Sequence, residues 1–337
     1  MTQFILKDAA KMTYKEIYEK AVSELKSANI DEAELDAFYL LSFVTGLRKA
    51  DYYLKLNEAV DERVTERYFE LIKRRAMHMP CQYITGSAEF MGLEFEVSRA
   101  VLIPRQDTET LVEKAVEVIR KIGIADKFAI DCDERGHTKE DDETELSDEG
   151  KQNSVSDEEA ETSVTKNISN NIKILDMCTG SGCIAVSVKH FCKHADVTAV
   201  DISDSALEIA KHNAEKNGAE IEFVKSDMFE KLDGRMFDVI LSNPPYVTES
   251  EYETLMPEVK DNEPKLALTA GADGLDFYKI IANEAPMHLK RNGKLILEIG
   301  CEQAQAVKNL LEENRFSNIQ IIKDLPGLDR VVYAEIF

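Results

Sequence analysis

The stretch Ile172-Lys-Ile-Leu-Asp-Met-Cys-Thr-Gly-Ser-Gly-Cys183 decides the fold of this 337-residue chain. It begins as a short apolar run of strand length, and a helical pattern over 183–194 follows its glycines at once. Glycines at such a turn let the backbone approach a ligand closely, and the start of the helix offers unpaired N–H groups. Cys178 stands where the G-x-G-x-x-G motif has its first glycine, so the turn alone does not identify a ligand.

Strand-like and helical segments alternate from residue 171 to the end of the sequence. This alternation predicts an α/β fold, a mostly parallel sheet with helices on both faces. The last two apolar runs flank Pro326-Gly327 and predict an antiparallel edge. The predicted strands are 172–177, 197–200, 221–224, 237–241, 294–299, 319–322 and 330–336, and the predicted helices between them are 183–194, 203–217 and 275–289.

The first 85 residues predict a small helical domain. Thr13 and Glu16 form a capping box before an amphipathic pattern, and further helices are predicted after Asp31 and Asp61. Apolar residues then nearly alternate over 89–104, which predicts a β-hairpin between two domains. The expected division is a helical domain at 1–85, a hairpin linker at 86–107 and a larger domain at 108–337, which begins with a helix near Thr108.

An acidic segment interrupts the larger domain at 131–171. It contains 14 acidic and 4 basic residues, a net charge of −10, and scarcely any large apolar side chains. Such a segment buries too little apolar area to offset its ordering entropy, so we expect a disordered insertion. A solvated spacer and a tether for a basic partner are both open interpretations.

Composition and charge exclude several classes of function. The chain has 41 basic and 64 acidic side chains, and its formal charge of −23 repels nucleic-acid phosphates. The first residues lack the pattern of a signal peptide, and no apolar run approaches the roughly 18 residues that span a bilayer. We therefore expect a cytoplasmic monomer without membrane or direct nucleic-acid contacts. The cysteines lack C-x-x-C spacing and the His/Cys cluster at 190–194 fits helix packing, so no metal site is predicted.

Carboxylates follow two further predicted strands. Asp201 lies about 20 residues after the glycine turn, where it can accept both ribose hydroxyls of a nucleoside. Asp227 can accept from an adenine amino group while Met228 or Phe229 covers the ring. Since ligands collect at the carboxyl ends of strands, these groups predict one adenosyl site. The predicted cofactor residues are Cys178, Thr179, Gly180, Ser181, Gly182, Asp201, Asp227, Met228 and Asn243.

The fourth strand runs directly into Asn243-Pro244-Pro245-Tyr246. Two prolines remove two N–H groups and leave rigid carbonyl acceptors. A planar NH2 group can donate to the Asn243 side chain and to the Pro244 carbonyl, while Tyr246 offers an aromatic face. The alternative is a plain turn, which Asn-Pro often begins, but a turn has no need of the whole set. We predict that all four residues bind the substrate as a clamp, and that Asn243, Pro244 and Tyr246 are catalytic.

A clamp for planar nitrogen beside an adenosyl site indicates methyl transfer from S-adenosyl-L-methionine, with S-adenosyl-L-homocysteine as product. An amide nitrogen is a weak nucleophile because its lone pair is delocalised. Holding both N–H bonds directs the lone pair, so orientation and electrostatics are expected to supply most of the acceleration. No dedicated base is required, because the methylated nitrogen loses its proton readily.

Motifs outside the clamp carry a family resemblance. With the clamp after its fourth strand, the chain resembles the seven-stranded class I S-adenosylmethionine-dependent methyltransferases, which have a Rossmann-like sheet. Its flanking motifs are similar to those of the PrmC/HemK family, the protein-glutamine methyltransferases of peptide chain release factors. The resemblance covers nearly the whole chain except 123–171. The motifs are Tyr83-Ile-Thr-Gly-Ser-Ala-Glu-Phe-Met-Gly-Leu93, Leu102-Ile-Pro-Arg-Gln-Asp-Thr-Glu-Thr-Leu-Val-Glu113, Glu263-Pro-Lys-Leu-Ala-Leu268 and Gly271-Ala-Asp-Gly-Leu-Asp-Phe-Tyr278.

The resemblance implies methylation of the side-chain amide nitrogen (N5) of the glutamine in the Gly-Gly-Gln motif of class I release factors, a modification tied to translation termination. It implies that 178–182 forms the cofactor loop, that Asp201 holds the ribose, that Met228 lies beside the adenine and that the helical domain docks the release factor. Three positions depart from the family pattern: Cys178 for glycine, Met228 for an aromatic residue and Lys265 for arginine.

Two other functions are open on the sequence alone. A nucleic-acid methyltransferase acting on adenine N6 or guanine N2 would suit the clamp, but the acidic charge counts against it. A non-catalytic adenosyl-binding protein is the second alternative, and the intact clamp beside an intact loop counts against that. Arg105, Asp107 and Glu109 have two interpretations, ion pairing and substrate contact.

Overall fold

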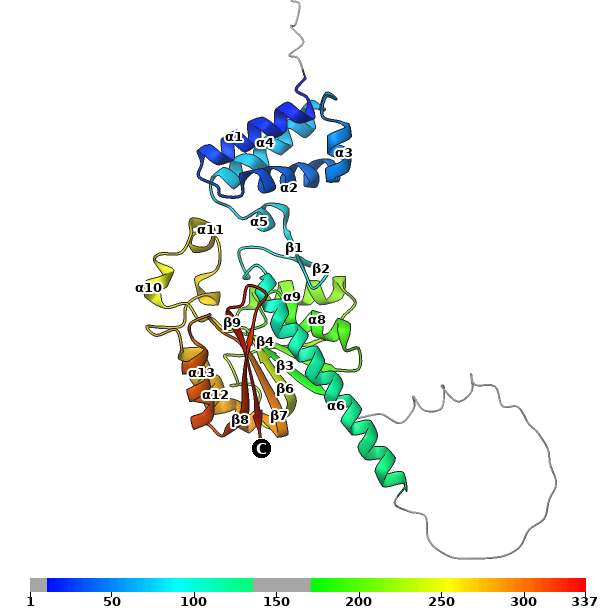
Figure 1. Cartoon of the computed structure of the whole chain (residues 1–337), viewed down its shortest axis with the longest axis vertical. Coiled ribbons are helices and arrows are strands. Elements are labelled where there is room, and N and C mark those ends of the chain that lie inside the picture. Colours follow the sequence, from blue (N-terminus) through cyan, green and yellow to red (C-terminus); the bar gives the residue numbers. More distant parts are fainter. Residues whose placement is uncertain (1–10, 136–170) are drawn as a thin grey trace, which may run out of the picture. The chain divides into compact units, whose positions relative to one another are not determined.

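The computed structural model describes residues 11–135 and 171–337 (Figure 1). The chain forms two compact units. Among the described residues, the first consists of 11–104 with 247–274, and the second of 105–135 and 171–246 with 275–337. None of the helices in the described ranges is long and apolar enough to cross a membrane.

Helices dominate the first unit. Thr13 caps the first helix, donating its N–H to Glu16 Oε2 at 2.8 Å, which confirms the predicted capping box. Asp61 caps the fourth by accepting from the Arg63 N–H at 2.9 Å. Buried apolar side chains of these helices form one core that includes Ile17 and Leu40. The helices are α1 Tyr14–Ser27, α2 Ala33–Thr45, α3 Lys49–Leu54, α4 Glu62–Ala76 and α5 Cys81–Thr85.

A hairpin and a segment distant in sequence complete this unit. Strands β1 (Ser87–Phe90) and β2 (Leu93–Glu96) pair antiparallel, so the hairpin is shorter than the alternating pattern over 89–104. Arg75 joins the distant segment to the helices, because its guanidinium donates to Asp36 Oδ2 at 2.7 Å and to Glu258 Oε1 at 3.1 Å. The distant segment holds α10 Glu249–Tyr252, α11 Pro257–Lys260 and the 3₁₀ helix η2 Lys265–Ala267.

The second unit is built on a seven-stranded sheet, with strand order β5-β4-β3-β6-β7-β9-β8. The first five of these strands are parallel, while β9 runs antiparallel to both of its neighbours. The predicted mostly parallel sheet with an antiparallel edge is therefore confirmed. The strands are β3 Lys173–Met177, β4 Asp196–Asp201, β5 Glu222–Lys225, β6 Phe237–Ser242, β7 Leu289–Glu298, β8 Phe316–Lys323 and β9 Asp329–Ile336.

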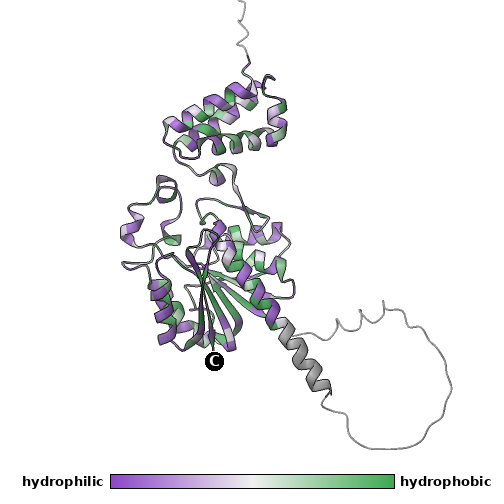
Figure 2. Cartoon of the chain, viewed as in Figure 1, coloured by the Kyte–Doolittle hydropathy of each residue, from purple (hydrophilic) through white to green (hydrophobic). Residues whose placement is uncertain are grey.

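Helices cover both faces of the sheet (Figure 1). On one face lie α6 (Glu109–Arg135), α8 (Cys183–Phe191) and α9 (Asp204–Lys216), and on the other lie α12 (Asp276–His288) and α13 (Ala304–Glu313). The 3₁₀ helix η1 (Gln106–Thr108) precedes α6. Figure 2 shows hydrophobic residues concentrated in the strands, whereas the helices carry both kinds. This distribution fits strands that are covered on both faces.

The helix α6 runs further than the sequence predicts. It continues to Arg135, five residues into the segment at 131–171 for which we expected no folded structure. That boundary was wrong, because the helical pattern that begins near Thr108 extends into the acidic segment. The rest of the predicted insertion, 136–170, lies outside the described residues.

Candidate active site at the carboxyl edge of the sheet

The register of the sheet brings the predicted site residues to one edge. Met177 of β3 pairs with Val200 of β4 on one side and with Ser242 of β6 on the other. Ser242 also pairs with Leu297 of β7. The residues that follow these positions therefore lie together at one edge of the sheet: Asp201 and Glu298 end their strands, and Cys178 and Asn243 are the first residues beyond theirs.

The glycine turn after β3 adopts the left-handed backbone that its sequence predicts. Gly180 has φ +56° and Gly182 has φ +80°, and Gly182 is the N-cap residue of α8. A Cβ on Gly182 would lie 3.0 Å from the Ala210 Cβ, whereas a Cβ on Gly180 would meet nothing within 4 Å. Gly182 thus allows α8 to approach α9, and Gly180 keeps space open beside the loop. Cys178 is also left-handed, with φ +61°.

The buried side chain of Asp176 hydrogen-bonds to the glycine turn and to the start of α8. Its Oδ2 accepts from Thr179 Oγ1 at 2.6 Å and from the Ala185 N–H at 3.1 Å, and the whole residue is buried. Burial raises its pKa to about 7 against these two donors, which act in the opposite direction. Its Oδ1 has no hydrogen-bond partner within the described residues, so a buried acceptor is left for a ligand.

Asp201 lies beside the same loop. Its Oδ2 accepts from the Gly180 N–H and its Oδ1 from the Ser203 N–H, both at 2.9 Å. Burial raises the pKa of Asp201, and these backbone donors counter the shift. Each carboxylate oxygen has a second lone pair, so both can still accept a hydroxyl.

The three residues Asp227, Met228 and Phe229, which follow β5, differ in burial and in contacts. Asp227 is exposed, while Met228 is buried with a left-handed φ of +44° and its Sδ lies 3.9 Å from Cys178 Sγ. Phe229 is buried and stacks on His288 at 4.9 Å between ring centroids. One face of the Phe229 ring is covered by His288, and whether Phe229 covers an adenine ring stays a prediction. Met228 remains the predicted neighbour of the adenine.

The clamp follows β6 as a partly buried turn. Pro244 and Pro245 are buried, while Asn243 and Tyr246 are partly exposed. Gln303 contacts Tyr246, the last residue of the clamp. The Gln303 Nε2 donates to the Tyr246 carbonyl at 3.0 Å, and the Gln303 Oε1 accepts from the Gly300 N–H at 3.0 Å. A Cβ on Gly300 would lie 3.4 Å from Tyr246 Cδ2. Burial raises the pKa of Tyr246 to about 12, so its hydroxyl stays neutral near pH 7.

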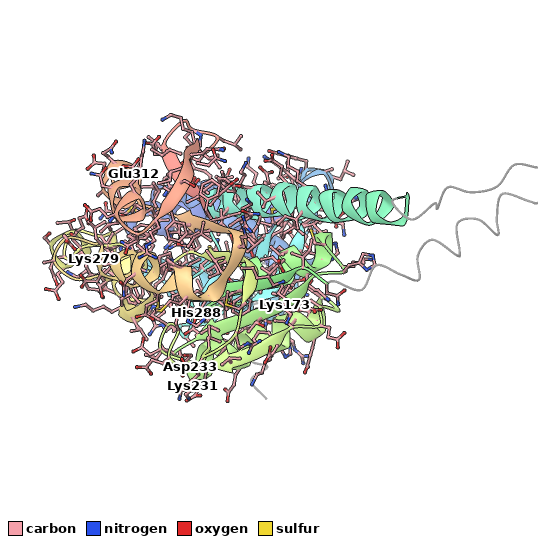
Figure 3. All side chains as sticks on the ribbon, turned by 90° about the horizontal axis from the view of Figure 1, so that it is seen from below. Lys173, Lys231, Asp233, Lys279, His288 and Glu312 are labelled. Atoms are coloured by element: carbon pink, nitrogen blue, oxygen red, sulfur yellow. The ribbon has the colours of Figure 1, made fainter. Side chains whose placement is uncertain are left out.

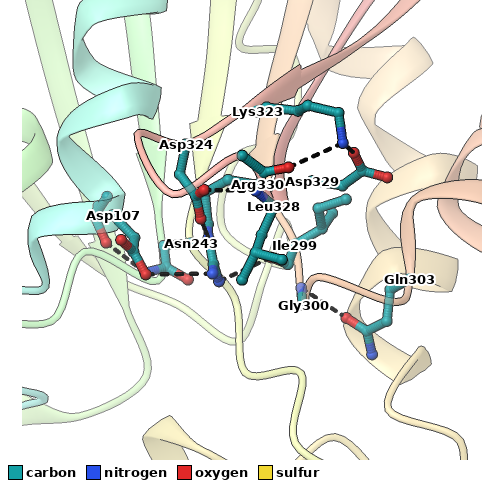
Figure 4. Close-up of polar contacts among 12 residues, drawn as sticks. Asp107, Asn243, Ile299, Gly300, Gln303, Lys323, Asp324, Leu328, Asp329 and Arg330 are labelled. Atoms are coloured by element: carbon teal, nitrogen blue, oxygen red, sulfur yellow. Dashed lines mark hydrogen bonds and ion pairs between the residues drawn. The ribbon is translucent and has the colours of Figure 1, made fainter.

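Behind the clamp lies a polar network that sequence reasoning missed. Asn243 Nδ2 donates to Thr108 Oγ1 at 3.3 Å, and both side chains lower the pKa of the buried Glu298 carboxylate, which burial raises. Arg330 pairs with Asp107 at 3.2 Å and with the buried Asp324 at 3.1 Å, and Figure 4 shows these contacts beside Asn243. Of the two interpretations of Asp107, the structure shows ion pairing. The sequence signal for this pair was weak, because Arg330 begins a predicted strand and Asp324 lies in the turn before it, and single charges at such positions are usually solvated.

Comparisons with known proteins decide the family. Residues 16–86 match the PrmC N-terminal domain and residues 160–261 match the methyltransferase small domain. A release factor glutamine methyltransferase from Clostridium acetobutylicum is 35% identical over 329 residues, which cover 96% of this chain and 98% of that protein. The chain belongs to the release factor glutamine methyltransferase family. Proteins of the same name from Fusobacterium nucleatum (36% identity, 95% of this chain, 78% of that protein) and Geobacter sulfurreducens (33%, 93% of each) agree.

This family member is therefore a methyltransferase, and the carboxyl edge of its sheet is the candidate active site. A cavity of about 780 Å³ lies at the opposite edge, lined by Lys173, Glu222, Arg235 and Lys290 among others. Figure 3 labels Lys173, the first residue of β3, which is one of the residues that line this cavity. None of the predicted site residues lines this cavity. Within the described ranges no three His, Cys, Asp or Glu side chains gather as metal ligands.

Proposed function

We propose that this methyltransferase transfers a methyl group from S-adenosyl-L-methionine to the side-chain amide nitrogen of the glutamine in the Gly-Gly-Gln motif of peptide chain release factors. The observation that carries the proposal is the position of Asn243. Its side chain leaves the sheet at the same edge as the glycine turn and Asp201. Family membership supports the release factor as substrate, because full-length relatives carry that name.

The residues at the edge fit an adenosyl amino acid. The unpartnered, buried Oδ1 of Asp176 offers an anionic acceptor for an ammonium group, and the two oxygens of Asp201 can each accept a ribose hydroxyl. Gly180 leaves room for a ligand because no atom lies within 4 Å of where its Cβ would be. When bound, S-adenosylmethionine supplies an electrophilic methyl group.

The clamp residues prepare the nitrogen. The Asn243 side-chain oxygen and the Pro244 carbonyl each accept a hydrogen bond from one N–H group of the substrate amide. Held in this way, the lone pair of the amide nitrogen points toward the adenosyl site. The Tyr246 ring supports the amide plane, and its neutral hydroxyl adds no charge. Gln303 fixes the Tyr246 carbonyl, so the turn is rigid before substrate binds.

The net charge supports a protein substrate. The chain carries a formal charge of −23, which opposes binding to phosphate backbones. We expect the protein to act as a monomer in the cytoplasm, where release factors function. The first unit, with its helical bundle, is the part that we propose docks the release factor.

One labelling experiment tests this function. The purified protein is incubated with radiolabelled S-adenosylmethionine and a release factor, its Gly-Gly-Gln Gln→Ala variant, or nucleic acid. We expect label on the intact release factor alone, and label on nucleic acid alone would overturn the proposal.

The Asn243→Ala variant tests the clamp in the same assay. S-adenosylmethionine affinity is expected to stay within about twofold while kcat falls at least about a hundredfold, because only the transition-state hydrogen bonds are lost. Asn314→Ala, at the end of α13, is the matched control and should keep wild-type activity. Equal loss of cofactor binding and methyl transfer in folded Asn243→Ala would contradict the role of the clamp.

A further inference from the structure

Glu298 is a buried carboxylate that the proposed reaction does not use. It ends β7, is 1% exposed, and its Oε2 has no hydrogen-bond partner in the part of the chain that the structure describes. Burying an incompletely paired carboxylate is costly, and here burial raises the pKa of Glu298 to about 7. A group retained at such a cost at the substrate edge calls for a role.

The contacts of Glu298 lead directly to the clamp. Asn243 and Glu298 directly follow Ser242 and Leu297, which pair across β6 and β7, and Asn243 Nδ2 donates to Thr108 Oγ1 at 3.3 Å. The Thr108 and Asn243 side chains both lower the pKa of Glu298, as hydrogen-bond donors beside a carboxylate do. A carboxylate accepts hydrogen bonds and donates none. Thr108 Oγ1 accepts from Asn243, so the Thr108 hydroxyl hydrogen is left to point toward Glu298 in the arrangement that we infer.

This arrangement decides which way the Asn243 amide faces. An amide can rotate by half a turn, which exchanges its oxygen and its NH2 group. In the exchanged orientation, the Asn243 oxygen would face the carboxylate, an acceptor against an acceptor. An ionised Glu298 thus excludes that orientation and leaves Oδ1 free to accept a substrate N–H.

We propose that Glu298 is a positioning residue, which acts through Thr108 and Asn243 to present the Asn243 side-chain oxygen to the substrate amide. The proposal rests on the proposed function and names a residue outside the clamp that this function requires. Glu298 does not touch the reacting atoms in this role. It sets the geometry of the group that does.

Replacing Glu298 by glutamine tests the role with little change in shape. A glutamine can donate as well as accept, so both orientations of Asn243 become allowed. We expect kcat for the release factor to fall about ten- to a hundredfold, while KM for S-adenosylmethionine and the KM for the release factor change less than about threefold. Thr108→Val should show the same split, and Thr108→Ser should restore activity because it returns the hydroxyl.

The pH profile of kcat separates positioning from a structural effect. Wild-type kcat should rise as Glu298 ionises near pH 7, and this rise should be absent from Glu298→Gln. Burial also raises the pKa of Asp176 to about 7. Because Asp176 is present in both the wild type and Glu298→Gln, its effect on kcat is the same in the two pH profiles. Burial raises the pKa of Tyr246 and Cys183 to about 12, so neither titrates in this range. The charged and titratable groups facing Glu298 are Asp107, Arg330, Tyr246, Tyr278 and Cys183.

Glu335→Gln is the matched control. Glu335 lies on β9, where it pairs with Lys294 at 3.1 Å, and its loss should leave kcat and the pH profile unchanged. Wild-type kcat and an unaltered pH profile in folded Glu298→Gln would overturn the positioning role. If the wild-type protein itself does not methylate the release factor, the proposed function fails instead, so the two failures are distinguishable.

Discussion

Replacing Gly182 by alanine should destabilise the second unit through two separable effects. Gly182 holds a left-handed backbone with φ +80°, which costs an alanine about 1 kcal/mol. Its new Cβ would also lie 3.0 Å from the Ala210 Cβ and 3.2 Å from the Ala210 Cα. The second neighbour is backbone of α9, so the contact is relieved only by moving a helix, at about 1–3 kcal/mol. The expected loss is about 2–4 kcal/mol.

Gly180→Ala provides the control for this prediction. Gly180 is also left-handed, with φ +56°, but its added Cβ would meet nothing within 4 Å. It should therefore lose only the backbone cost of about 1 kcal/mol. Urea unfolding at fixed pH, followed by circular dichroism, measures both losses. Equal losses in the two variants would refute the argument that Gly182 is required for the packing of α8 on α9.

Three further predictions concern ionic and capping groups. Arg330→Met leaves the buried Asp324 unpaired and should cost about 3–5 kcal/mol in urea unfolding, whereas Lys323→Met, which removes an exposed pair, should cost less than about 1 kcal/mol. Burial raises the pKa of Glu298 from 4.5 to about 7, so folded-state stability falls as the pH rises through that interval; Glu298→Gln should be roughly 3 kcal/mol more stable than wild type at pH 8 and equal at pH 4. Thr13→Ala removes a capping box and should cost about 1 kcal/mol by thermal unfolding, and no change would contradict that role.

The sheet could be predicted because its strands carry their own signals. Each of the seven strands was found from a short apolar run. The run is clearest in β3, β4 and β6, which are almost wholly buried, because a strand covered on both faces has few polar positions. The carboxyl edge of the sheet could be predicted as well, because the residues that follow parallel strands meet at that edge. Cys178, Asp201 and Asn243 were placed at that edge on this ground, and the register brings them there.

The network behind the clamp could not be predicted, because it depends on pairing between distant strands. Glu298 ends β7 and Thr108 lies in η1, and only the fold brings them to Asn243. In sequence, Glu298 resembles any charge after an apolar run. The grouping of 247–274 with the first unit was hidden for the same reason, since the contacts that join them are between residues far apart in sequence, such as Arg75 and Glu258, 183 residues apart.

The helix α13 was missed although its signal was present. Ala304, Val307 and Leu311 are buried on one side at helical spacing. The segment between the fifth and sixth apolar runs was simply not assigned. The short helices α10 and α11, at four residues each, lie below the length at which periodicity carries information.

In the proposed reaction the clamp presents a glutamine amide nitrogen for methylation. The most direct measurement is fragment-ion mass spectrometry of a release factor after incubation with the protein and S-adenosylmethionine. We expect a single methyl group on the side-chain nitrogen of the Gly-Gly-Gln glutamine, absent when Asn243→Ala replaces the wild-type protein. A methyl group on another residue of the release factor, with that glutamine unmodified, would contradict the account.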